Sequence, residues 1–558
     1  MTCQVWARGL GQWHNQKKDT HPLDFDVILH EIRKYLTTRC STVFIERERR
    51  YSGDDFTMKE SEYLLNPNKL VRYLKKPSSH FTKQDLIRFI EDTGIEMLNF
   101  RYVGGDDRLK TLNFVIQGRR HLEALFSTGE RVDGSSLFSY ISSDSSDLYI
   151  IPRFKTAFVN PFSDIPTLDI LCSFYTREGK PLESAPEYIL RKAHREFKKA
   201  TGYTLKAMGE LEYYVMSEKI DLYPVADQKG YHSSPPFTKW DCIRIDALKR
   251  IAEAGGRVKY GHSEVGTFSI ANSAFEQHEI EFLPVDVEDA ADHLLIARWV
   301  LRMIGCEYGV SISFAPKIAV GKAGNGLHIH MLVEKDGENL MADEDGLSDI
   351  GKGVIAGLLD LAGPLTAFGN TIPPSYLRLV PGQEAPTTIC WGDRNRSVLV
   401  RVPLGWVART RMIKDANPQE TGEVPYIPGK QTIEFRSPDG SADIYSLLAG
   451  IVMAAQRGLE MADALKRVQE LYVDVDIFKE EHKDKLERLD HLPTSCRESA
   501  ECLEERRNFF GKNNIFPQGT IDTIVRNLKS FNDKDLIQRL QGKDDEIRKL
   551  VESFLHCA

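Results

Sequence analysis

The sequence lacks the short motifs that usually identify an enzyme class. It contains no GxxxxGK[ST] phosphate-binding loop, no GxGxxG after a strand, no HExxH and no GxSxG. These absences exclude the common nucleotide-binding loops, the zinc peptidase helix and the serine nucleophile elbow. Any nucleotide must therefore be held by another arrangement of side chains.

Long apolar runs, paired cysteines and excess basic charge are also missing. The most apolar stretch, 447–455, is too short to span a bilayer, and the N-terminus has no continuous apolar segment of signal-peptide type. The nine cysteines form no CxxC pair, and the net charge is -8. We therefore expect a cytoplasmic protein with reduced thiols that binds neither nucleic acid nor membrane.

Hydrophobic periodicity predicts an α+β protein in three parts. Residues 1–90 form an N-terminal extension with two helices, 25–37 and 83–93, and no recognisable chemistry. Residues 91–175 form a small domain with strands at 95–103 and 111–116. Residues 176–558 form a sheet-centred domain that ends in charged helices. In it we expect strands at 205–216, 276–283, 326–333, 397–403 and 431–437, and helices at 185–201, 288–305, 351–368 and 445–465.

Three of the expected strands place polar side chains at every second position. In MGELEYYVM, Glu210 and Glu212 share one face while apolar residues occupy the other. In GNGLHIHMLV the same pattern brings His328 and His330 together, and in QTIEFRS it joins Glu434 and Arg436. Each pair alone is compatible with a solvated strand face or a surface ion pair. Their recurrence favours buried carboxylates and an imidazole that hold cations.

Arginines cluster in the segment that connects the last two of these strands. Arg378, Arg394, Arg396 and Arg401 lie around Pro and Gly turns within 372–403. Guanidinium groups bind planar carboxylates and phosphates, although four arginines alone could be surface charge. Combined with ligands for hard cations, they indicate phosphoryl transfer, in which catalysis is mainly positioning and charge neutralisation.

Six ordered blocks resemble the conserved blocks of type I glutamine synthetases: RVDGSSLFSY, MGELEYYVM, GNGLHIHMLV, RLVPGQEAP, RNRSVLVRVP and IEFRSPDGSADIY. The resemblance covers about residues 96–540. It implies a β-grasp-like N-terminal domain, a catalytic domain with a curved antiparallel sheet and flanking helices, and a homo-oligomer with active sites at subunit interfaces. The expected assembly is a dodecamer of two hexameric rings.

The resemblance also implies roles for individual residues. Glu212, Glu264 and Glu279 match the ligands of one divalent cation, Mg²⁺ or Mn²⁺, and Glu210, His328 and Glu434 match those of a second. Gly324 and Arg378 match positions that bind glutamate. The positions around the ATP phosphates and the transition state are matched by His330, Arg396, Arg401 and Arg436.

The nitrogen donor is implied by a further group of positions. Asp133, Tyr231 and Glu264 match an ammonium pocket, with Asp133 as the base and supplied by a neighbouring subunit, and Glu384 matches a flap that closes over the intermediate. Two features depart from the family pattern. The segment between Glu264 and Glu279 is longer than usual, and Ala323 replaces an asparagine whose contact Asn325 or the main chain would have to supply.

The implied reaction is ATP-dependent ligation of ammonia to the γ-carboxylate of L-glutamate through a γ-glutamyl phosphate. Two alternatives remain. One is a γ-glutamyl ligase for polyamines or other amines, which would share the ATP and cation apparatus. The other is a catalytically silent structural relative, which we would expect to have lost cation ligands.

Overall fold

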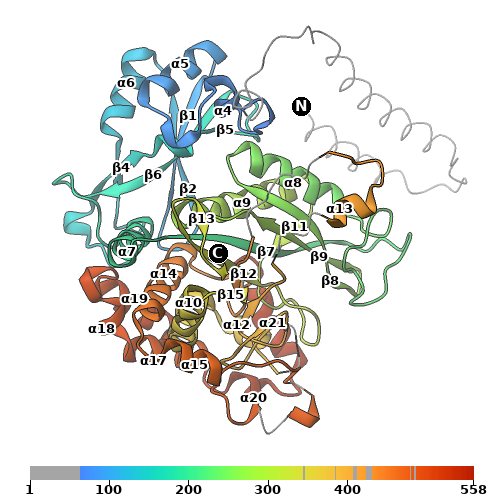
Figure 1. Ribbon diagram of the computed structural model, residues 1–558. Coiled ribbons are helices and arrows are strands. Elements are labelled where there is room, and N and C mark those ends of the chain that lie inside the picture. The colour runs from blue at the N-terminus through green and yellow to red at the C-terminus, as the bar shows by residue number, and fades with distance from the viewer. Residues whose placement is uncertain are drawn as a thin grey trace, which may run out of the picture. The chain divides into compact units, whose positions relative to one another are not determined.

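The computed structural model describes residues 63–343, 346–381, 383, 385–405, 411–422, 430–477, 479–482 and 486–557 (Figure 1). The helix predicted at 25–37 and the flap residue Glu384 lie outside these residues. The helix predicted at 83–93 is confirmed as α5 (Lys83–Thr93). A Thr82–Asp85 capping box begins it, and Gly94, with φ of 68°, ends it in the left-handed region.

The first sheet has the order β2-β1-β6-β4-β3, with β5 beside β6. Strands β1 and β6 are parallel, and the other pairs are antiparallel. This confirms the small β-rich domain with strands near 95–103 and 111–116. The sheet consists of β1 (Met97–Val103), β2 (Leu109–Val115), β3 (Glu130–Asp133), β4 (Asp147–Pro152), β5 (Phe158–Val159) and β6 (Thr167–Tyr175), accompanied by α4 (Lys69–Leu74), α5 and α6 (Arg119–Thr128).

The second sheet carries the polar strands identified in the sequence. Its order is β16-β17-β18-β12-β7-β9-β8, with β10 and β11 on β7 and β13 on β12. All pairs are antiparallel except β16 with β17. The members are β7 (Thr204–Glu218), β8 (Val258–Ile270), β9 (Ser273–Phe282), β10 (Val285–Asp286), β11 (Ser311–Ser313), β12 (Leu327–Lys335), β13 (Glu338–Asn339), β16 (Trp391–Asp393), β17 (Val400–Val402) and β18 (Ile433–Phe435).

Helices cover one face of this sheet and form the main core with it. Apolar residues of β7 and β12, such as Leu211 and Ile329, are fully buried in the same cluster as Leu294, Leu358 and Leu448 of the helices. The helices that contribute to this core are α7 (Pro186–Thr201), α8 (Asp241–Glu253), α9 (Val287–Tyr308), α10 (Asp349–Asp360), α11 (Ala362–Gly369), α14 (Ile444–Glu460), α17 (Cys496–Glu505) and α19 (Gln518–Ser530). With its apolar face buried, the sheet presents its polar side chains on the other face.

The single helix predicted at 351–368 is wrong. Two helices, α10 and α11, occupy this stretch and meet at an angle of 74°. Pro364 is the third residue of α11, and a proline inside a continuous helix would clash with the carbonyl four residues earlier and lack an N–H donor. The break at Leu361 removes that conflict.

No single helix among the described residues is long and apolar enough to cross a membrane. Of the described helices, only the bent pair of α10 and α11, with its two helices taken together, has the length and apolar composition of a membrane span. Both are almost completely buried in the protein core. The seven cysteines in the described part of the chain are free thiols.

Helices α10 and α14 approach so closely that only glycine fits at their contact. A Cβ added at Gly357 would lie 1.9 Å from the carbonyl oxygen of Ala454. We expect Gly357→Ala to lower the free energy of unfolding by about 1–3 kcal/mol, because overpacking forces the helices apart. Gly519→Ala on α19 is the control, since its Cβ would meet no atom within 4 Å and alanine favours a helix. Urea denaturation measures both, and equal stability of the two variants would contradict the packing argument.

Candidate active site

The polar face of the second sheet lines a cavity of about 770 Å³. Every candidate cation ligand and substrate- or phosphate-binding residue predicted from the sequence lines it, whereas Asp133 does not. Strands β7, β9 and β12 supply its centre, and β8, β17 and β18 supply the flanks. Arg394, grouped with the other arginines from the sequence, is exposed and is not among the lining residues.

Strand register explains why these side chains meet. His328 lies directly opposite Glu210, and Glu279 lies opposite Glu212. On the other side, Glu434 lies between His330 and Arg401. Directly opposed residues share a face and have Cβ atoms about 4.5–5.5 Å apart. Period-two spacing along each strand and register between strands therefore build one polar surface.

Three groups of side chains could each hold a cation. In each group the ligand atoms lie within 4.8 Å of one another. The groups are Glu210 with His328 and Glu434, Glu212 with Glu279 and His328, and His262 with Glu264 and Glu279. The first reproduces one predicted ligand set. The other two groups contain the three residues of the second predicted set, with Glu279 in both, and each group also includes a histidine.

Electrostatics favours positive charge at these groups. Burial, reinforced by the charge of Glu264, raises the pKa of Glu212 to about 8. Burial and the repulsion of Glu210 and Glu212 raise the pKa of Glu279 well above its usual range. Crowded buried carboxylates ionise fully only when a cation compensates them, and carboxylate oxygens with one imidazole suit Mg²⁺ or Mn²⁺. The residues present therefore fit the implied cations.

Histidines and arginines compensate the other two carboxylates, Glu210 and Glu434. The Glu210 carboxylate lies 3.0 Å from His328 Nδ1 and 2.8 Å from His330 Nε2. Although burial opposes it, the charge of His330 holds the pKa of Glu210 well below its usual range. Glu434 accepts hydrogen bonds from Arg401 at 2.8 Å and Arg436 at 2.9 Å. One end of the cavity thus carries guanidinium groups beside the cation ligands.

The longer segment between Glu264 and Glu279 extends a hairpin instead of separating the two carboxylates. Strands β8 and β9 continue pairing to Ile270 opposite Ser273, and an irregularity between Ser263 and Thr267 takes up the changed register. His262 Nε2 lies 3.1 Å from a Glu279 oxygen. The added residues therefore lie beyond the site, and Glu264 remains in it.

The substitution at Ala323 is not compensated by Asn325. The Asn325 side chain is fully buried and donates to the carbonyls of Ser313 and Ala315. Ala323 and Gly324 line the cavity, whereas Asn325 does not. Of the two replacements considered from the sequence, the main chain is the one that faces the cavity.

Sequence reasoning missed several lining residues. His262 and Glu281 stand two positions from Glu264 and Glu279 on β8 and β9, so the same period-two rule applied to these strands would have found both. Glu281 lies opposite Glu210 and 2.7 Å from Lys259. The other end of the cavity is lined by Met208, Leu283, Pro284, Leu332, Pro403 and Leu404, for which the sequence held no recognisable signal.

Asp133 lies at the end of β3, in the first sheet, and is exposed. It accepts hydrogen bonds from the hydroxyls of Ser136 and Ser135, at 2.6 and 2.7 Å, and these lower its pKa well below the usual value. Such a carboxylate stays ionised and attracts cations, but it is a weak proton acceptor. It is not among the lining residues of the cavity within one chain.

Family models match two segments of the chain. The glutamine synthetase β-grasp domain matches residues 94–177, and the glutamine synthetase catalytic domain matches residues 183–535. The chain belongs to the glutamine synthetase family. This confirms the resemblance and the α+β fold inferred from the ordered sequence blocks.

Individual members of the glutamine synthetase family are distant from this chain. Glutamine synthetase of Clostridium saccharobutylicum is 28% identical over 434 residues, which span 76% of this chain and 90% of that protein. The Mycolicibacterium smegmatis enzyme is 28% identical over 485 residues, spanning 80% and 94%. Both relatives therefore align over most of their length but share fewer than a third of the aligned residues with this chain.

Two solved structures share the fold. Plasmodium falciparum glutamine synthetase has a TM-score of 0.66 at 20% identity and covers 82% of this chain and 97% of its own. A protein named GmaS, solved without ligand, has a TM-score of 0.62 at 18% identity and covers 81% and 96%. At these identities the similarity establishes architecture, and the reaction must be argued from the site.

A buried glutamine contacts one of the candidate cation ligands. Gln277 is 1% exposed. Its Nε2 lies 3.1 Å from Glu212 Oε2 and 3.0 Å from the Gly324 carbonyl oxygen, and its Oε1 accepts from Gly266 N. It therefore links Glu212, a candidate cation ligand, to the turn that lines the cavity.

We expect Gln277→Leu to weaken Mn²⁺ binding about 10- to 100-fold, because groups that orient metal ligands typically contribute this much. Calorimetric titration with Mn²⁺ measures the change. Thermal unfolding of the same sample confirms that the variant is folded. A folded variant with unchanged Mn²⁺ affinity would show that Gln277 does not position Glu212.

Proposed function

We propose that this protein is a glutamate–ammonia ligase that uses ATP. The observation that carries the proposal is the joining, in one cavity, of three carboxylate–imidazole groups with Arg378, Arg396, Arg401 and Arg436. Phosphoryl transfer to a carboxylate brings together several negative groups, so it requires this kind of compensating charge.

Side chains of this chain prepare the first step. Arg378, which is 4% exposed, lies beside Gly324 and binds the substrate's carboxylate. Arg401 and Arg436 face the phosphates, and the Glu210 and Glu212 groups would hold two divalent cations, which would supply charge neutralisation. The γ-carboxylate oxygen of glutamate attacks the terminal phosphorus, and the bond to ADP breaks. The products are γ-glutamyl phosphate and ADP.

The second step requires a neutral nitrogen nucleophile. Ammonium is attracted by Glu264 near Tyr231, and Asp133 of a neighbouring subunit completes the pocket in a homo-oligomer, for which we propose a dodecamer of two hexameric rings. A carboxylate of this pocket, Asp133 or Glu264, accepts the proton before the attack. Ammonia attacks the acyl carbon, and phosphate leaves. We propose that Glu384 closes over this intermediate.

Phosphate release with different nitrogen donors tests the proposal. Purified protein with ATP, Mg²⁺ and glutamate is expected to release phosphate at least about tenfold faster with ammonium than with methylamine or putrescine at equal concentration, a preference of ~1.4 kcal/mol. Turnover with an amine but not with ammonium would identify an amine ligase. No turnover with any donor, with either Mg²⁺ or Mn²⁺, would identify a catalytically silent relative.

A further inference from the structure

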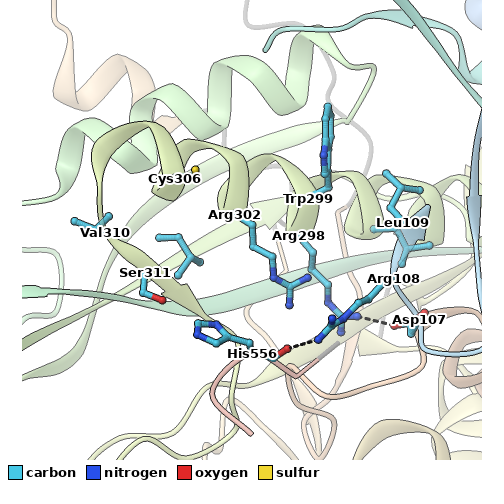
Figure 2. A pocket seen from close by; sticks show the side chains of 12 residues that line it. Asp107, Arg108, Leu109, Arg298, Trp299, Arg302, Cys306, Val310, Ser311 and His556 are labelled. Carbon is cyan, nitrogen blue, oxygen red and sulfur yellow. Dashed lines mark hydrogen bonds and ion pairs between the residues drawn. The ribbon is translucent and has the colours of Figure 1, made fainter. Parts of the chain in front are cut away.

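A second cavity, of about 440 Å³, shares no lining residue with the carboxylate cavity. It lies between the β1–β2 turn, helix α9, strand β11 and the segment that follows α21 (Asp544–Ser553). Figure 2 shows three arginines around it: Arg108 from the turn, and Arg298 and Arg302 from α9. Asp107 is the one carboxylate among the described residues that line it.

Arg298 forms an ion pair with Asp107. It is 2% exposed, and its Nη1 lies 2.7 Å from Asp107 Oδ2. Its Nη2 donates to the carbonyls of Gly440 and Ala442, both at 3.1 Å. Its Nε is buried and has no hydrogen-bond partner within the described residues. Asp107 therefore compensates Arg298, and the described residues that line the cavity include no second carboxylate for Arg108 and Arg302.

Arg302 and Arg108 contact neutral oxygens. Arg302 donates to the carbonyl of Cys557 at 2.7 Å, and Arg108 donates to the carbonyl of His556 at 2.8 Å. Burial and the nearby Arg298 lower the pKa of Arg302 to about 10. Positive charge held in a partly buried cavity without a counter-ion is unfavourable. The cavity therefore favours occupation by negative charge.

We propose that this cavity binds a small oxyanion with two negative charges, either a phosphate or a dicarboxylate. Guanidinium groups form parallel, charge-assisted hydrogen bonds with both kinds of oxyanion. Ser311 lines the same cavity and adds a hydroxyl donor. The volume is sufficient for an anion of a few carbon atoms together with water.

The position of the anion connects it with the C-terminal segment. The carbonyls of residues 555, 556 and 557 are held by Ser313, Arg108 and Arg302. Ser313 pairs with Tyr214 on β7, two residues from Glu212. The segment after 535 lies beyond the matched catalytic domain. A bound anion would strengthen the contact of this C-terminal segment with a strand of the candidate site.

Titration of the full chain with sodium phosphate and with sodium succinate, at constant ionic strength, tests the proposal. Calorimetry is expected to show saturable binding of at least one of them, and Arg302→Gln should weaken it at least about tenfold, the effect of ~1.4 kcal/mol from a charged hydrogen bond. Arg526→Gln, an exposed arginine of α19, is the matched control and should bind as the parent does. The anion that saturates at lower concentration identifies the ligand class.

A second pair of variants distinguishes anion binding in this cavity from phosphate binding in the carboxylate cavity. Arg401→Gln should leave the proposed site intact, whereas Arg108→Gln, at an exposed position suited to a folded variant, should weaken binding there. Unchanged affinity in both Arg302→Gln and Arg108→Gln would overturn the proposal. The absence of saturable binding by either anion would also overturn it.

Discussion

Replacing Glu210 with glutamine is expected to lower phosphate release at least about a thousandfold, the factor that corresponds to ~4 kcal/mol of lost charge stabilisation. Glu210 contacts both His328 and His330 and belongs to the group with Glu434. Glutamine keeps the size of the side chain but removes its charge and one of its two oxygen ligands. A steady-state assay of phosphate release measures the loss.

The matched control for Glu210→Gln is Glu334→Gln. Glu334 lines the same cavity, but it pairs with Lys206 and belongs to none of the three cation groups. We expect the control to change the rate less than about threefold, in line with a weakly coupled surface ion pair. Calorimetry with Mn²⁺ should show loss of binding in Glu210→Gln alone. Equal loss of activity in both variants would contradict the assignment of Glu210 to a cation.

Replacing Arg396 with glutamine is expected to reduce kcat by about 10²- to 10³-fold, the usual effect of removing one donor that stabilises transition-state charge. Arg396 lines the cavity but is itself exposed. Against the lowering effect of burial, a hydrogen bond with Tyr231 raises its pKa, so the guanidinium stays charged. Its loss should therefore affect the reaction more than folding.

Arg394→Gln provides a control from the same turn. Arg394 is exposed, stands two residues away and does not line the cavity. Both variants should keep their free energy of unfolding within about 0.5 kcal/mol of the parent, as surface substitutions usually do. Arg394→Gln should also keep its kcat. A comparable loss of kcat in the two variants would indicate a general effect of charge and would contradict a specific role for Arg396.

Much of the site follows from the sequence because strand geometry is simple. The alternation of Glu210 and Glu212, and of His328 and His330, fixes which side chains share a face. The sequence does not fix register, and register is what places His328 opposite Glu210 and Glu279 opposite His262. His262 and Glu281 follow the same alternation on β8 and β9 and were predictable, but the residues that lie opposite them were not.

Other features depend on contacts that are distant in the sequence. The second cavity brings together Arg108, Arg302 and His556, which are separated by up to 448 residues. No local sequence pattern predicts contacts at such a separation. The long segment before Glu279 was compatible with either a displaced ligand or a longer hairpin, and pairing energy selected the hairpin. The break at Leu361 was predictable, since Pro364 cannot occupy the interior of one continuous helix.

The most direct test of the proposed function is the fate of the nitrogen. Purified protein is incubated with ATP, Mg²⁺, glutamate and ¹⁵N-labelled ammonium, and glutamine and ADP are quantified by mass spectrometry. We expect ¹⁵N-glutamine in equal amount to ADP, and neither product above background in Glu210→Gln. ADP formation without labelled glutamine, or no reaction while Mn²⁺ binds normally, would contradict it.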